Sequence, residues 1–77
     1  MPPDIKIIHS SIDDNILTTE FTSGETAFYL EYNINKEDFK EISIASQGEE
    51  FYFRYSWETL TLEMQNLIDE TVSEILD

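Results

Sequence analysis

The sequence from residue 57 to residue 77 has the only long helical pattern in the chain, and this pattern constrains the fold most. The residues of its less polar stripe recur at intervals of three and four, as on one face of an α-helix: Leu60, Met64, Leu67, Ile68, Thr71, Val72 and Ile75. Ser56 can cap a helix that begins at Trp57. Alternatively, Thr61 can cap a helix that begins at Leu62 after a separate single turn. We expect a helix that is continuous or slightly broken.

The segments before this helix alternate apolar and polar residues, which is typical of half-buried β-strands. We expect strands over residues 4–10, 16–22, 26–34, 41–46 and 50–56. Polar turns and connections are expected at residues 10–15, 23–25, 35–40 and 47–49. Short links followed by one helix predict an α+β fold, an antiparallel β-meander of four to five strands packed on one face by a single C-terminal α-helix. Residues 1–77 are expected to form a single domain, with residues 1–3 as a frayed tail.

The two faces of the predicted sheet differ in chemistry. The face that accepts the helix is expected to contain Leu17, Phe21, Phe28, Leu30, Tyr32, Ile42, Ile44, Phe51 and Phe53. The other face is expected to carry Thr18, Glu20, Tyr29, Glu31, Ser43, Tyr52 and Arg54. Tyr and Arg are enriched at interface hot spots, which makes the second face a candidate binding surface. The simpler interpretation is that its tyrosines only cover the sheet, because Tyr is common in strands.

The charge balance limits the possible partners. Seventeen acidic residues stand against four basic ones, giving a formal net charge of −13. Nucleic-acid binding neutralises phosphates with Lys and Arg, and here these residues are scattered singly at Lys6, Lys36, Lys40 and Arg54. Direct binding to nucleic acid or to an anionic membrane is therefore not expected. No apolar run reaches the ~20 residues of a membrane span, and the start lacks a signal-peptide pattern, so we expect a cytoplasmic protein.

The outward face of the predicted helix carries a row of acidic residues, Glu63, Glu70, Glu74 and Asp77, with no Lys, Arg or His anywhere in residues 57–77. At 1.5 Å rise per residue their axial gaps are about 10, 6 and 4.5 Å. This spacing is comparable to that of phosphates along a DNA strand, so the row can present a nucleic-acid-like string of charge to a basic groove. The alternative interpretation is a solvated face that only keeps the chain soluble.

The sequence contains little that could support catalysis. Cysteine is absent, His9 is the single histidine, and the only glycines are Gly24 and Gly48. A Gly-x-Ser-x-Gly elbow and a phosphate-binding glycine loop are therefore missing, and a Ser–His–acid arrangement would have to use His9, for which a structural role is the simpler interpretation. Three carboxylate pairs could attract Ca²⁺ or Mg²⁺ loosely without forming a calcium loop, although solvated turn residues are the simpler interpretation: Asp13 with Asp14, Glu37 with Asp38, and Glu49 with Glu50. We expect no enzyme activity, no metal site and no cofactor.

The overall profile, a very small and strongly acidic α+β chain without catalytic apparatus, looks like that of phage-encoded inhibitors that mimic DNA, including anti-CRISPR and anti-restriction proteins. The resemblance lies in composition, and no motif is shared. It implies an inhibitor, monomeric or homodimeric, that binds a basic, nucleic-acid-binding surface of a partner protein. The expected partner-binding residues are Glu63, Glu70, Glu74, Asp77, Tyr29, Glu31 and Tyr52. Alternatives are an immunity protein or antitoxin that neutralises a basic nuclease toxin, and an adaptor module that binds through its open sheet face.

Overall fold

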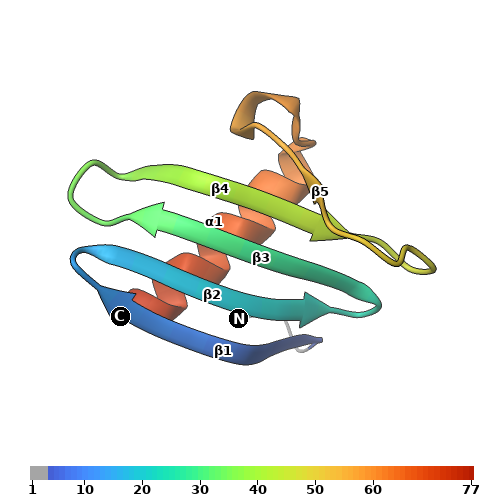
Figure 1. Cartoon of the computed structure of the whole chain (residues 1–77), viewed down its shortest axis with the longest axis horizontal. Helices are drawn as coiled ribbons and strands as arrows, with labels where there is room; N and C mark the ends of the chain where they lie inside the picture. The colour runs from blue at the N-terminus through green and yellow to red at the C-terminus, as the bar shows by residue number, and fades with distance from the viewer. Residues whose placement is uncertain (1–3) are drawn as a thin grey trace.

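In a computed structural model, the chain forms a five-stranded antiparallel sheet with one α-helix on one of its faces (Figure 1). The elements are β1 (Ile5–Asp13), β2 (Ile16–Ser23), β3 (Thr26–Asn33), β4 (Asp38–Ala45), β5 (Phe53–Arg54), the 3₁₀ turn η1 (Trp57–Thr59) and α1 (Leu62–Leu76). The strands lie in chain order, β1-β2-β3-β4-β5. The predicted α+β meander with a single C-terminal helix is confirmed. The structure describes residues 4–77, so the tail that was expected to be frayed lies outside the described residues.

The first hairpin is tighter than the sequence pattern suggested. Asp14 and Asn15 both have positive φ, 52° and 65°, and alone connect β1 to β2. Positive φ at both central residues matches the twist of a two-residue hairpin, and Asp and Asn tolerate it. The strand therefore continues to Asp13, with Ile12 paired to Leu17. The expectation of a turn over residues 10–15 was wrong for its first four residues.

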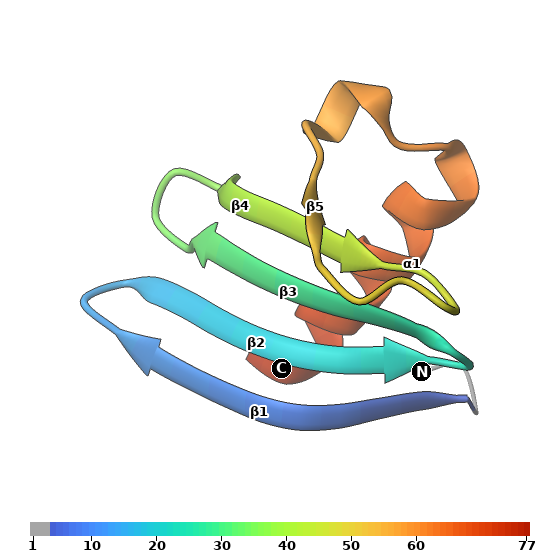
Figure 2. The ribbon, with the colours of Figure 1, turned by 45° about the vertical axis from the view of Figure 1, so that its right-hand side comes forward.

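The core lies between the sheet and α1, which crosses the sheet diagonally (Figures 1 and 2). Six predicted core residues of the sheet are buried there: Leu17, Phe21, Phe28, Leu30, Ile42 and Ile44. Leu60, Ile68 and Val72 complete this core from the C-terminal part of the chain. The rings of Phe21 and Phe28, which are cross-strand partners, stack with centroids 4.7 Å apart. The predicted alternation of β2 and β3 is therefore correct, and Tyr32 packs at the edge of the core.

The predicted burial of Phe51 and Phe53 was wrong, because these residues are 72% and 51% exposed. The expected strand over residues 50–56 is reduced to Phe53–Arg54. Leu60 joins the core, and Trp57 packs against it. The chain therefore leaves the sheet soon after β5. The alternation of apolar and polar residues in this segment does not predict which side chains are buried.

The helix is broken, and its second predicted start is the correct one. Within the described residues, Ser56 makes no side-chain capping bond to η1. Leu60 is extended, with φ −78° and ψ 149°, which ends this turn. Thr61 then caps α1, because its Oγ1 accepts a hydrogen bond of 3.2 Å from the backbone N–H of Met64. A helix continuous from Trp57 is therefore excluded.

Candidate partner-binding surfaces

The predicted acidic row lies on the side of α1 that faces away from the sheet. Its four members, Glu63, Glu70, Glu74 and Asp77, are all exposed. Glu63 is in the first turn, where a negative charge is favourable to the helix dipole. Asp77 is the C-terminal cap, where it is unfavourable by about 0.3–1 kcal/mol. The last turn contains no basic residue. The negative end of the helix dipole and the carboxylates therefore both contribute negative potential at this end of α1.

The second surface is the open face, which we define as Thr18, Glu20, Tyr29, Glu31, Ser43, Tyr52 and Arg54. Strand register places all of these side chains except that of Tyr52 together, since cross-strand partners share a face. Tyr29 lies between Glu20 on β2 and Ser43 on β4, and Ser43 in turn pairs with Arg54 on β5. Tyr52 lines a shallow hollow with Glu20, Tyr29, Glu41 and Ser43. No helix of the described chain lies on this side of the sheet (Figures 1 and 2).

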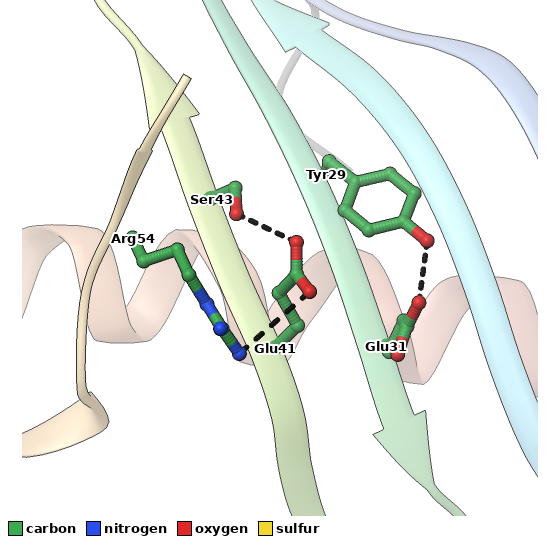
Figure 3. A network of polar contacts seen from close by, with 5 residues as sticks. All are labelled: Tyr29, Glu31, Glu41, Ser43 and Arg54. Carbon is green, nitrogen blue, oxygen red and sulfur yellow. Dashed lines mark hydrogen bonds and ion pairs between the residues drawn. The ribbon is translucent and has the colours of Figure 1, made fainter.

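A polar network links the centre of the open face (Figure 3). The Tyr29 hydroxyl donates a hydrogen bond of 2.5 Å to Glu31 Oε2, and Ser43 Oγ donates one of 2.9 Å to Glu41 Oε2. Arg54 Nη2 lies 3.7 Å from Glu41 Oε1, but the Arg54 side chain is 73% exposed, so this ion pair contributes little to stability. Two neighbouring carboxylates are thus each held by a neutral hydroxyl.

The same network changes the acidity of Tyr29. Several causes together raise the pKa of Tyr29 from 10.0 to about 12, and the hydrogen bond to Glu31 is the largest of them. The others are burial and the charges of Glu31, Glu41 and Glu20. Tyr29 therefore remains a neutral hydrogen-bond donor at physiological pH, and its aromatic ring provides a contact surface among carboxylates.

The structure separates the predicted site residues into two groups. Tyr29, Glu31 and Tyr52 lie on the open face, whereas the acidic row lies on the outward side of α1, beyond the opposite face of the sheet. One flat partner surface cannot contact both groups at once. The two surfaces must therefore be considered as separate candidate sites.

Sequence reasoning missed a groove at the end of the sheet where β4, β5, η1 and α1 meet. This groove has a volume of about 520 Å³ and is lined by aromatic and acidic side chains. The aromatic residues are Tyr32, Phe39, Tyr55 and Trp57. The aromatic residues of segment 51–57 could have indicated this groove. Their alternation was interpreted only as a further strand of the sheet.

Two properties of residues 4–77 concern metal binding and membranes. Within residues 4–77, no group of three or more His, Cys, Asp or Glu side chains is placed to hold a metal ion. No helix in the same part of the chain is long and apolar enough to cross a membrane.

Comparison of the chain with protein-family models, with curated proteins and with solved structures finds no match. The class that the structure defines is an α+β meander with one helix, carrying an acidic helix face and a polar open sheet face.

Proposed function

We propose that the chain is a non-enzymatic cytoplasmic inhibitor whose acidic row binds a basic, nucleic-acid-binding surface of a partner protein. The observation that carries the proposal is the charge of the C-terminal part: residues 57–77 contain six carboxylates and no Lys, Arg or His. All four members of the acidic row are exposed on one side of α1. A net charge of −13 on so small a fold creates self-repulsion that a cationic partner relieves.

The proposed mechanism is competition for a basic surface. Complementary charge steers the chain to this surface and raises the rate of association. The rigid helix then holds its carboxylates at spacings comparable to those of nucleic-acid phosphates, and the true ligand is excluded while the inhibitor is bound. In this respect the chain would act like phage anti-CRISPR and anti-restriction proteins. An immunity protein or antitoxin bound to a basic nuclease would use the same physics with a different partner.

The experiment is a capture assay with the immobilised chain in a lysate of its native host. Captured proteins are eluted at low and high salt, or with a DNA duplex, and are identified by mass spectrometry. The proposal predicts that the captured partner is a nucleic-acid-binding protein and that both salt and the duplex release it. The reason is that the immobilised chain, the salt ions and the duplex compete for the same basic groups of the partner. A specific partner that resists salt and the duplex contradicts it.

A second candidate function is that of an adaptor that binds through the open face. The observation that favours it is the facing pair Glu31 and Glu41, a destabilising arrangement on a side of the sheet where α1 does not lie. Arg54 already lies 3.7 Å from Glu41 but is largely exposed, so a partner that contacts Tyr29 and Tyr52 and brings a further cation to this pair would relieve the remaining repulsion. Loss of binding in Tyr52→Ala, with weak dependence on salt, would favour this candidate over the acidic row.

A further inference from the structure

The groove beside β4 has an aromatic wall made by residues from distant parts of the chain. Phe39, from β4, and Trp57, from η1, stack with centroids 5.2 Å apart and an interplanar angle of 9°. The rings of Tyr32 and Phe39 pack with centroids 4.8 Å apart. Tyr55 also lines the groove and is 40% exposed. Figure 2 shows the chain from β5 through η1 to α1 as an arch beside β4. The groove is therefore a feature of tertiary structure with an accessible aromatic lining.

The charge of the groove is strongly asymmetric. Five carboxylates line it, from Glu37, Asp38, Glu41, Glu58 and Asp69, together with two cations, from Lys40 and Arg54. Burial and the charges of Glu37, Asp69 and Asp38 raise the pKa of Tyr32, so these carboxylates act directly on the aromatic wall. An anionic ligand is therefore disfavoured, and a cationic ligand is favoured.

We propose that this groove receives an arginine side chain of the partner protein. The inference rests on the proposed function, in which the partner surface is basic. A guanidinium is planar, stacks on aromatic faces and forms paired hydrogen bonds with carboxylates. Cation–π attraction acts within about 6 Å of a ring centroid and is strongest for Trp. A lysine ammonium has the same charge but lacks the planar face and the paired N–H donors of a guanidinium. Arginine therefore fits this combination of aromatic and carboxylate groups better.

The position of Asp69 connects the groove to the acidic row. Asp69 lines the groove, whereas Glu70, the next residue of α1, belongs to the acidic row. A basic surface that lies along α1 can therefore place one arginine into the groove while its other cations face the row. A control for Asp69 is Glu25, an exposed carboxylate on the turn between β2 and β3 that belongs to neither the groove nor the acidic row.

The test uses an arginine-rich peptide and a lysine-rich peptide of the same length, titrated at low salt. Trp57 is the only tryptophan of the chain, so its fluorescence reports directly on the groove. We expect the arginine peptide to bind more tightly than the lysine peptide. Asp69→Asn should weaken arginine-peptide binding by about 5-fold, equivalent to roughly 1 kcal/mol. Glu25→Gln, on the exposed turn between β2 and β3, should change it by less than about 2-fold, since exposed charges that make no close contact contribute little.

Glu58→Gln is a second groove variant, from η1, and should behave like Asp69→Asn. Thermal unfolding of each variant verifies the fold. Equal weakening by Asp69→Asn and Glu25→Gln, or equal binding of the two peptides, would overturn the groove proposal. Either result leaves the proposed function intact if the captured partner is still released by salt and the DNA duplex. Conversely, the groove proposal is supported if arginine-selective binding is observed and Asp69→Asn weakens it. This holds even if neither salt nor the DNA duplex releases the captured partner.

Discussion

Glu31 on β3 and Glu41 on β4 are direct cross-strand partners on the open face of the sheet. Like charges at facing positions destabilise an antiparallel pair, so this position is not optimised for stability. Tyr29 and Ser43 each donate a hydrogen bond to one of the two carboxylates, and the exposed Arg54 guanidinium lies 3.7 Å from Glu41, which together reduce the repulsion. The open face thus retains two close negative charges.

Neutralising one member of this pair should stabilise the fold. Glu41→Gln removes the repulsion together with the ion pair to Arg54, which contributes little, and should raise the free energy of unfolding by about 0.2–1 kcal/mol. The gain should be larger at low salt, because salt screens the repulsion in the wild-type chain. Urea unfolding at two salt concentrations measures both effects. Glu25→Gln, on the exposed turn between β2 and β3, is the matched control, and a net loss of stability in Glu41→Gln would show that the pair is not repulsive.

The acidity of Tyr29 makes stability depend on pH in the alkaline range. The pKa of Tyr29 is raised from 10.0 to about 12, so the folded chain keeps a proton that the unfolded chain loses near pH 10. This contribution is fully present below the unfolded pKa and is lost as pH rises through the folded pKa. Tyr29→Phe should therefore flatten the fall in unfolding free energy over this window. Glu31→Gln, which removes the main cause, should shift the tyrosinate absorbance titration of Tyr29 to lower pH, and an unchanged titration would contradict the assignment.

The break before α1 can be tested through its cap. Thr61→Ala removes the oxygen that accepts from the Met64 N–H and should lower the free energy of unfolding by about 0.5–2 kcal/mol. Thr61→Ser keeps an acceptor and should retain most of the stability. Ser56→Ala should have a smaller effect than Thr61→Ala. Chemical denaturation of the three variants gives the order, and a larger loss in Ser56→Ala would instead favour a helix from Trp57.

The charge of α1 should oppose its stability. Ser73 is exposed in the last turn of the helix, near the negative end of the dipole. Ser73→Lys should raise the free energy of unfolding by about 0.3–1 kcal/mol while weakening partner binding, because it places a cation beside the acidic row. Ser73→Gln separates helix propensity from charge and should leave binding close to that of wild type. Tighter partner binding by Ser73→Lys would be inconsistent with an electrostatic interface on this helix.

Periodicity predicted the sheet where each strand has one buried face. The alternation of Leu17, Phe21, Phe28 and Leu30 was enough to assign β2 and β3 and their two faces, since a side chain in a strand has only two directions. The same rule placed Tyr29 and Glu31 on the open face. These parts of the fold are determined by local pattern.

Periodicity failed where a tertiary contact decides the conformation. Phe51 and Phe53 alternate like core residues, but the chain leaves the sheet and Trp57 stacks on Phe39. This contact, made between segments far apart in the sequence, also builds the aromatic groove, so no local pattern could reveal it. The start of α1 was also ambiguous from the sequence, because both Ser56 and Thr61 are suitable caps by residue type.

The most direct test of the central claim is the affinity of the captured partner for two charge-reversal variants with the same net charge. Glu70→Lys with Glu74→Lys alters the acidic row, whereas Glu25→Lys with Glu50→Lys alters exposed loops between strands. We expect the first pair to weaken binding by on the order of 100-fold or more, with the fold preserved, and the second pair to have a much smaller effect. Equal losses in both variants, or full binding by the first, would contradict an inhibitor that acts through the outward face of α1.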